Sequence, residues 1–132
     1  MANEAVCIEP YTKVVRYTVI DGTAIAKGTL LKVTTDPNTA SATSADADSF
    51  AGIAIEEKVI SDGITEIGCA VDGTWDLVAG TGAIICGNLV AISGANLIRV
   101  AEAKDFVSGS FVGKALETAS ASERIRVRIG VI

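Results

Sequence analysis

Apolar residues in this chain recur at every second position, and this spacing constrains its fold more than any other feature. In the clearest case four aliphatic residues alternate with three arginines and a glycine; the apolar positions are Ile125, Val127, Ile129 and Val131. Period-two alternation sends successive side chains to opposite faces of a strand, so it predicts a half-buried β-strand. Helical spacing is almost absent. The chain is therefore expected to be all-β.

Turn signals divide the chain into short strands. Three Asp-Gly pairs and one longer turn accept the positive φ of tight turns; they are Asp21-Gly22, Asp62-Gly63, Asp72-Gly73 and Ser93-Gly94-Ala95-Asn96. The predicted strands lie near 13–20, 29–35, 50–58, 64–71, 74–78, 88–93, 96–101, 111–117 and 123–131. Many short strands joined by turns are typical of a barrel or a sandwich.

Two segments depart from this strand pattern. Thr34–Ser49 is rich in Thr, Ala, Ser and Asp around Pro37, and we expect an exposed loop there because the segment is too weakly apolar to pack. Ala101–Asp105 consists of good helix formers, although five residues are too few to establish a helical turn.

Three segments of the chain recur in the same order about sixty residues later. Ser49-Phe50-x-Gly52-x-Ala54-x-Glu56 returns as Ser110-Phe111-x-Gly113-x-Ala115-x-Glu117, 61 residues on. Ile25-x-x-Gly28-x-Leu30-Leu31-x-Val33 returns as Ile84-x-x-Gly87-x-Leu89-Val90-x-Ile92, 59 residues on. More loosely, Thr65, Ile67, Cys69 and Val71 match Ile125, Val127, Ile129 and Val131 at an offset of 60. We interpret this as duplication; the alternative is chance recurrence of small residues in a low-complexity β protein.

The repeats and the length define the expected domain organisation. A chain of 132 residues fits one domain. We expect an N-terminal arm at 1–13 and a single β domain at 14–132, with pseudo-repeats at roughly 25–71 and 84–131. The arm is apolar at Val6, Cys7, Ile8 and Tyr11. It could lie on a neighbouring molecule, fray, or form an edge strand of its own sheet.

Composition limits the partners. The chain is 49% hydrophobic but only 5% aromatic, so part of its aliphatic surface is expected to be buried against other subunits. Its formal charge of −5 disfavours nucleic acid, which requires clustered cations. No apolar run approaches the roughly 18 residues of a membrane span. Without a basic start and an apolar core typical of a secretory signal, the expected location is the cytoplasm of the producing cell.

Residues with catalytic or metal-binding chemistry are few. The chain has no histidine, which removes the usual general base and the commonest metal ligand. Cys7, Cys69 and Cys86 are too widely spaced to indicate a disulfide framework or a zinc site. Gly80-Thr81-Gly82 completes no phosphate-binding motif, and Asp46-Ala47-Asp48 lacks the rest of a calcium loop. No catalytic residue, metal site or cofactor is predicted.

Trp75 and an arginine stripe are candidates for subunit contacts. Trp75 is the only tryptophan and is either an interface anchor or an ordinary core residue. Arg124, Arg126 and Arg128 share one face of the last strand. Such a stripe either meets a carboxylate-rich partner or forms a solvated strand face.

Several segments resemble the capsid cement, or head decoration, proteins of tailed bacteriophages. The similarity covers nearly the whole chain and depends on order and spacing more than on any single string; the segments are Ala2–Ala5, Tyr17–Val19, Asp21–Lys32, Phe50–Ala54, Ser93–Ile98 and Val112–Ala119.

The resemblance implies a compact β-tulip or barrel-like domain without enzymatic activity. It further implies a homotrimer on the outer capsid of the virion, where the protein bridges subunits of the major capsid protein, without contact to nucleic acid or membrane. Such proteins reach the shell through an extended arm, which suggests Val6, Ile8 and Tyr11 as capsid contacts. Trp75 and the three arginines are the candidates for the subunit interface.

Two other classes remain open at this stage. A carbohydrate- or receptor-binding β module could use the loop Thr34–Ser49, although the few aromatics argue against sugar stacking. An accessory domain of an enzyme could share the I-x-x-G-x-L turn, but no modifiable lysine on a hairpin tip can be identified.

Overall fold

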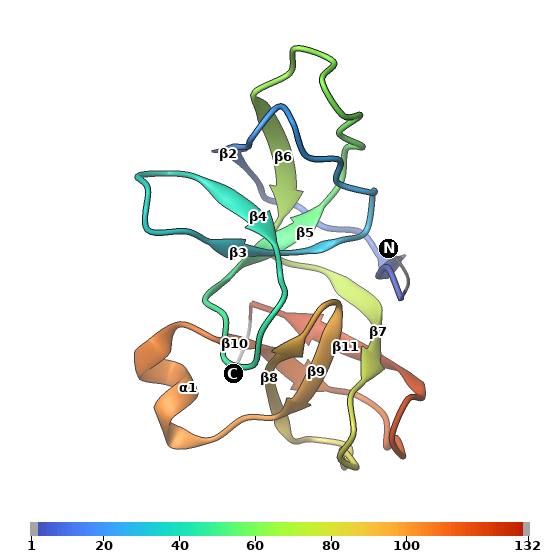
Figure 1. The fold of residues 1–132 in the computed structure, drawn as a ribbon. Helices are drawn as coiled ribbons and strands as arrows, with labels where there is room; N and C mark the ends of the chain where they lie inside the picture. The colour runs from blue at the N-terminus through green and yellow to red at the C-terminus, as the bar shows by residue number, and fades with distance from the viewer. Residues whose placement is uncertain (1–2, 131–132) are drawn as a thin grey trace.

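Two successive groups of five strands each close into a small barrel in the computed structural model, which describes residues 3–130 (Figure 1). The first barrel consists of β2 (Val14–Thr18), β3 (Leu30–Val33), β4 (Ala40–Ala42), β5 (Phe50–Ala54) and β6 (Glu66–Ala70). The second consists of β7 (Thr74–Ala79), β8 (Leu89–Gly94), β9 (Leu97–Val100), β10 (Phe111–Ala115) and β11 (Arg124–Ile129). The predicted all-β, barrel-like fold with two similar halves is confirmed.

Both barrels use the same strand order and the same closure. Antiparallel pairing runs β2-β6-β5-β3-β4 in the first and β7-β11-β10-β8-β9 in the second. A parallel bridge between Thr18 and Thr39 closes the first barrel. Parallel pairing of β7 with β9, through Val78 and Leu97, closes the second. Closure removes most of the unpaired edges that an open sheet would leave.

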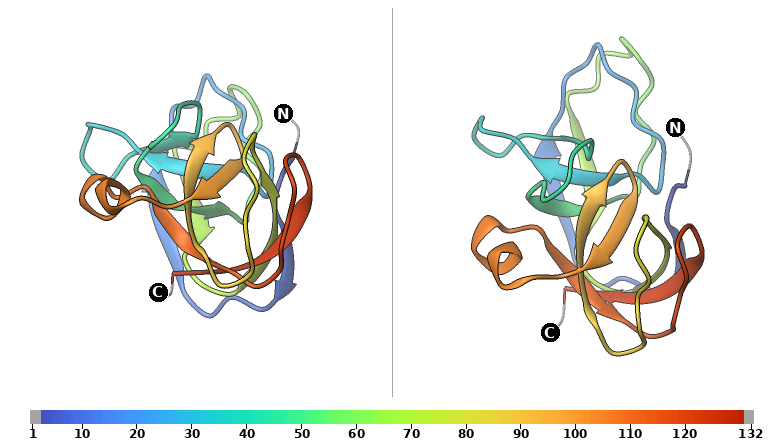
Figure 2. Two further views of the ribbon diagram at one scale, coloured as in Figure 1. Left: turned by 90° about the horizontal axis from the view of Figure 1, so that it is seen from below. Right: turned by 60° about the horizontal axis from the view of Figure 1, so that its bottom comes forward.

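Two further elements lie outside the repeated frame. The segment β1 (Val6–Glu9) pairs antiparallel with β7, so of the alternatives open for the N-terminal arm the structure contains the edge strand. The helix α1 (Ala103–Ser108) connects β9 to β10 and ends at Gly109, whose φ is 78°. Figure 2 shows that α1 lies at the side of the molecule opposite the N-terminal segment. No helix within residues 3–130 is long and apolar enough to cross a membrane.

Several backbone hydrogen bonds occur at corresponding places in the two halves. Gly28 N–H donates to the Ala54 carbonyl at 2.8 Å, and Gly87 N–H donates to the Ala115 carbonyl at 2.8 Å. This agrees with the offsets of 59 and 61 in the first two sequence echoes. The third echo is corrected: the N–H groups of Ile55 and Leu116 donate to the carbonyls of Gly68 and Arg126, which are 58 residues apart rather than 60. Ile67 and Cys69 therefore correspond to Ile125 and Val127.

The interiors of the two barrels are built from the corresponding alternating residues. The first interior contains Val19, Ile25, Leu31, Ala40, Ala51, Ala54, Ile67 and Cys69, with Val15, Tyr17 and Val33 at its margin. Their counterparts in the second interior include Ala79, Ile84, Val90, Ile98, Val112, Ala115, Ile125 and Val127. Burial raises the pKa of the Cys69 thiol to about 11, as expected for a cysteine on the apolar face of its strand.

The outer face of the first barrel packs on the second barrel. Leu30, Ile53 and Ala70 point away from their own barrel and belong to the core of the second. Asn96, in the hairpin between β8 and β9, fastens the two barrels together. Its Oδ1 accepts the Leu30 N–H at 2.9 Å, and its N–H donates to Thr43 Oγ1 at 3.1 Å. Each of these buried polar groups thereby has a partner.

Three sequence expectations are corrected. Thr34–Ser49 is not simply an exposed loop: it contains β4, and Ala40 and Thr43 are each only 1% exposed because small side chains fit against the neighbouring strand and barrel. The strand expected at 50–58 ends at Ala54, since Lys58 turns inward to meet two carboxylates. The helical segment lies at Ala103–Ser108, and Asp105 Oδ2 accepts the Glu102 N–H at its start.

Candidate docking site

Four branched aliphatic side chains are exposed together at the free end of the first barrel. They come from the loop after β2 and the loop between β5 and β6, which form the upper end of the molecule in Figure 1. Their exposed fractions are 65% for Ile20, 54% for Val59, 60% for Ile60 and 47% for Ile64. We call these four residues the aliphatic tip. Single exposed apolar residues are ordinary, but a group of large ones marks a contact surface.

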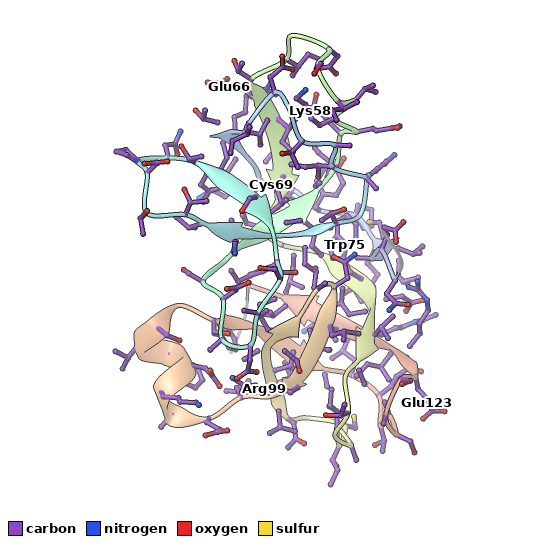
Figure 3. The ribbon with its side chains drawn as sticks, in the orientation of Figure 1. Lys58, Glu66, Cys69, Trp75, Arg99 and Glu123 are labelled. Atoms are coloured by element: carbon purple, nitrogen blue, oxygen red, sulfur yellow. The ribbon has the colours of Figure 1, made fainter. Side chains whose placement is uncertain are left out.

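A buried lysine holds the two loops together beneath the tip (Figure 3). The side chain of Lys58 has no exposed surface, and its ammonium donates to Asp21 Oδ1 at 2.7 Å and to Asp62 Oδ1 at 2.5 Å. It also donates to the carbonyls of Val59 at 2.7 Å and Asp21 at 3.1 Å. A buried charge is tolerated only where such partners surround it.

The two carboxylates extend this network into the loop backbone. Asp62 accepts the N–H groups of Ile64 at 2.9 Å and Val59 at 3.2 Å, and Asp21 accepts that of Gly63 at 2.9 Å. Two of the four tip residues are therefore fixed directly by the Asp62 side chain. A surface ordered before binding loses less conformational entropy when a partner docks.

The pKa values of the network reflect this arrangement. The hydrogen bond from Lys58 is the largest cause that lowers the pKa of Asp62, to about 2, and the bond from Ile64 N–H adds to it. Burial alone lowers the pKa of Lys58, but its bonds to Asp21 and Asp62 more than offset this, so the net pKa is raised. Lys58 and Asp62 are thus both charged near neutral pH.

The second barrel has the same turn without the tip. Ser120 N–H donates to Glu123 Oε1 at 2.6 Å, as Val59 N–H does to Asp62. The counterpart of Lys58 is Ala119, since the Ile25–Lys58 bridge corresponds to the Ile84–Ala119 bridge. Ser120 and Ala121 then stand where the first barrel has Val59 and Ile60, and Gly80 stands where it has Ile20. The lysine network and the aliphatic tip therefore occur together in the first barrel and not at the corresponding turn of the second.

The residues suggested by sequence as contacts lie elsewhere. Trp75 is 4% exposed, stacks on Tyr11 with ring centroids 5.9 Å apart, and donates its indole N–H to the Asp72 carbonyl at 3.0 Å. This favours the core alternative for Trp75 over an interface anchor. In the N-terminal segment Val6 is 51% exposed, whereas Ile8 and Tyr11 are half-buried.

The arginine stripe forms an exposed face of the second barrel, at the opposite end of the molecule from the tip. Arg124 donates to the Glu4 carbonyl at 3.0 Å, and Arg126 lies opposite Asp76 on β7. Arg128 pairs with Lys114 on β10 and is also exposed. The three arginines alternate with buried residues along β11 and thus share one face as predicted.

Other polar candidates bind groups of the chain itself. Asp46 accepts from Arg99 Nε at 2.6 Å, and Asp105 accepts two further bonds from the same guanidinium at 2.7 and 2.9 Å. Asp48 accepts the N–H groups of Ser44 and Ala45. Within the described part of the chain, no group of three Cys, Asp or Glu side chains converges in a manner suited to a metal ion.

Sequence reasoning missed Lys58 and the tip. One signal was present: if the echo that ends at Glu56 and Glu117 is continued by two residues, it aligns Lys58 with Ala119. A lysine aligned with a small apolar residue is a candidate for burial. The identity of its partners could not be read in the same way, because Asp21 is 37 residues away.

Comparison with known proteins adds no identification. No protein-family model matches the chain, and no curated protein matches it.

Proposed function

We propose that this chain is a non-enzymatic decoration protein that binds the outer surface of a tailed-phage head through the aliphatic tip and bridges major capsid subunits. Sequence resemblance suggests the class, and one structural observation carries the proposal. Four large aliphatic side chains project from loops that the buried Lys58 network holds in place. Rigid, exposed apolar groups are the usual centres of protein–protein contacts.

The contrast between the two barrels supports this assignment. A repeated fold requires the turn at each barrel end, but it does not require aliphatic residues there, since the second barrel places Ser120 and Ala121 in the same turn. The aliphatic residues of the first barrel thus have no role in closing it. A role in contacting another molecule accounts for them.

The bridging role follows from the geometry of a trimer. Three tips on one particle bind a shell with an avidity far above that of one tip, because the second and third contacts form within an already bound complex. Binding to the assembled shell then stabilises it by mass action. The homotrimer itself is part of the proposal and is measured by light scattering coupled to size-exclusion chromatography.

Binding to expanded, undecorated heads of the encoding phage tests the function. We expect the purified protein to sediment with the heads and Ile60→Asp to bind at least about tenfold more weakly, because a charge in a desolvated contact is costly. The matched control is Val107→Asp on α1, since Val107 is 92% exposed and lies outside the tip. The proposal fails if wild-type protein does not bind heads, or if both variants bind as wild type does.

A further inference from the structure

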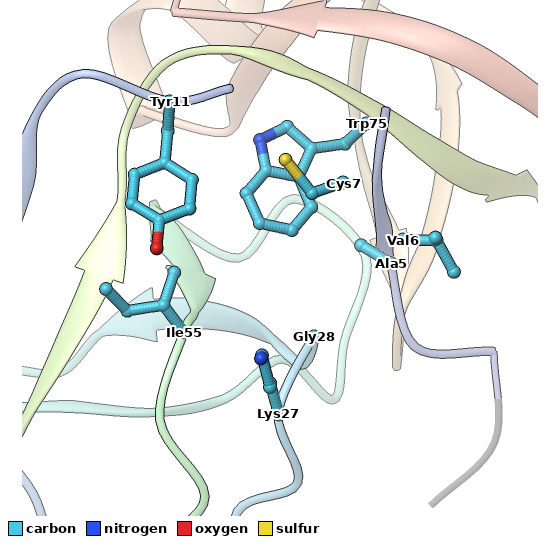
Figure 4. Close-up of a pocket in the computed structure, with 8 residues that line it drawn as sticks. All are labelled: Ala5, Val6, Cys7, Tyr11, Lys27, Gly28, Ile55 and Trp75. Atoms are coloured by element: carbon cyan, nitrogen blue, oxygen red, sulfur yellow. The ribbon is translucent and has the colours of Figure 1, made fainter. Parts of the chain in front are cut away.

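A cavity of about 360 Å³ lies where the N-terminal segment crosses the first barrel and meets β7 (Figure 4). Its walls come from both halves of the chain: Cys7 and Tyr11 from the N-terminal segment, Lys27 and Ile55 from the first barrel, and Trp75 from the second. This volume is within the range of roughly 300–1,000 Å³ typical of small-molecule sites. The aliphatic tip contributes no residue to it.

The floor of the cavity is aromatic and fixed. Tyr11 and Trp75 stack with an interplanar angle of 17°. The indole N–H is already bound to the Asp72 carbonyl, so the ring offers the cavity an apolar surface. Asp72 also accepts the N–H groups of Thr12 at 2.8 Å and Lys13 at 3.1 Å, which holds the chain beside Tyr11 in place. The Thr12 hydroxyl also donates to Asp72, and this bond is the largest cause that lowers the pKa of Asp72, followed by the two backbone bonds.

The side chain of Lys27 lies at the edge of the cavity. Figure 4 shows Lys27 extending its ammonium toward the aromatic pair, while Val6 points its side chain away. Among the described residues, no hydrogen bond or ion pair reaches the Lys27 ammonium. Lys27 is exposed to solvent. A cation at the edge of apolar walls complements a ligand that is apolar at one end and anionic at the other.

The N-terminal segment that forms one wall of the cavity has no counterpart beside Gly87, the equivalent of Gly28 in the second half. Ala5 N–H donates to the Gly28 carbonyl at 2.7 Å, and a β-carbon at Gly28 would lie 2.5 Å from the Ala5 carbonyl oxygen. At the counterpart, Gly87, a β-carbon would meet nothing within 4 Å. Cys86 and Leu116 replace Lys27 and Ile55 there. The cavity is therefore a feature of the place where the chain crosses itself.

We propose that this cavity binds a small amphipathic monoanion, with its carboxylate paired to Lys27 and its aromatic or branched aliphatic body against Tyr11, Trp75 and Ile55. This activity is separate from head binding and does not depend on it. For a ligand of about twelve heavy atoms in an open site, a dissociation constant on the order of 1 mM is expected.

A titration with 3-phenylpropionate, using 3-phenylpropionamide as the uncharged control, tests the proposal by NMR. Trp75 is the only tryptophan of the chain, so its indole N–H signal reports directly on the cavity. We expect saturable shifts at Trp75, Gly28 and Ile55 with the carboxylate, and binding about threefold weaker with the amide, as for loss of one exposed ion pair. Absence of saturable shifts, or equal binding of both compounds, overturns the proposal.

Variants of the wall give an independent test. Lys27→Gln should weaken carboxylate binding about threefold and leave amide binding unchanged. Cys7→Phe should fill the cavity and reduce binding of both compounds, and Cys86→Phe, the same change at another exposed cysteine, should not. Carboxylate binding that survives Cys7→Phe would place the ligand elsewhere and refute the site.

Cysteine labelling tests whether the ligand occupies this cavity. Bound 3-phenylpropionate should slow alkylation of Cys7 by iodoacetamide but not that of Cys86, since both are exposed and only Cys7 lines the cavity. Equal rates at Cys7 with and without a saturating ligand would contradict the proposal. Ile60→Asp should retain ligand binding and Lys27→Gln should retain head binding, so failure of one function is distinguishable from failure of the other.

Discussion

The two barrels share a backbone frame but differ at their outer surfaces. Leu30, Ile53 and Ala70 on the outside of the first barrel are fully buried against the second. Their counterparts Leu89, Lys114 and Arg128 are half-buried or exposed. The two barrels thus share the positions of their interior residues and backbone hydrogen bonds. The residues on the outer face of each barrel differ according to what that face contacts.

The same division applies to the barrel ends. In the first barrel a lysine replaces the alanine of the second, and the loops around it carry the aliphatic tip. In the second barrel the corresponding turn is small and polar. The second barrel instead carries the arginine stripe, and Arg16 and Glu66 of the first stand where the second has Asp76 and Arg124. None of these four charged residues belongs to the interior of either barrel.

The largest loss of stability is expected for a substitution at Gly113 in β10, which pairs with β8 and β11. A β-carbon at Gly113 would collide with the backbone of Arg128 and Ile129. We therefore expect Gly113→Ala to destabilise the protein by about 4 kcal/mol or more, because backbone cannot move aside. At the counterpart Gly52, where φ is 153°, the closest contact of a β-carbon would be the Ala70 carbonyl oxygen at 2.7 Å, against 2.0 Å for the Arg128 carbonyl oxygen at Gly113. Gly52→Ala should therefore also be destabilising, but by less. Urea unfolding followed by circular dichroism measures both, and equal losses would contradict this ranking.

A second pair of glycines isolates the contribution of the N-terminal segment. Gly28 and Gly87 have φ values of 90° and 94°, so alanine strains both equally. Gly87→Ala should cost only this strain, about 1–2 kcal/mol. Gly28→Ala should cost roughly 3 kcal/mol, because its β-carbon also displaces Ala5. If the two losses in urea midpoint are the same, the contact of Ala5 with Gly28 does not contribute to the stability of the first barrel.

Acid should loosen the loops that carry the aliphatic tip. The pKa of Asp62 is lowered from 3.8 to about 2. The stabilising contribution of a carboxyl with a lowered pKa is complete above its ordinary value and is lost as the pH falls toward the folded value. Between pH 4 and pH 2 we therefore expect faster backbone motion at Val59 and Ile64 in heteronuclear NOE measurements.

Two variants test whether the Lys58–Asp62 pair causes this acid effect. Lys58→Met should loosen the same amides already at pH 7, since it removes the partner of both carboxylates. Asp62→Asn should show a smaller change between pH 4 and pH 2, because position 62 no longer titrates while Asp21 still holds Lys58. Loops that stay rigid in wild-type protein at pH 2 would show that the Lys58 network does not order the tip.

Much of the fold could be predicted because the chain repeats one simple pattern. Alternation identified the long strands, and the echoes located Gly28, Gly87, Phe50 and Phe111 in corresponding places. The strand β4 escaped prediction because Ala40-Ser41-Ala42 has little apolar contrast. The offset of the third echo was wrong by two residues, since period-two alternation looks the same after any even shift.

The candidate sites were less predictable than the fold. The sequence does not reveal that Ile20 and Ile60 are exposed, because isoleucine is more often a core residue and its type alone does not distinguish the two environments. Trp75 had two open interpretations until its ring was found against Tyr11. The cavity beside Lys27 depends on where the N-terminal segment crosses the first barrel, and residues 1–13 alone allowed three placements.

The sequence by itself indicated that the chain is all-β, that its two halves repeat one pattern, and which face of the last strand is buried. These properties depend on neighbours one or two residues apart, or on similarity at a fixed offset. Only the tertiary structure decided that the outer face at Leu30 is covered, that Lys58 is buried between two carboxylates, and that the four tip residues are exposed. Alternation specifies on which side of a strand a residue lies, but what covers that side depends on how distant segments pack against it.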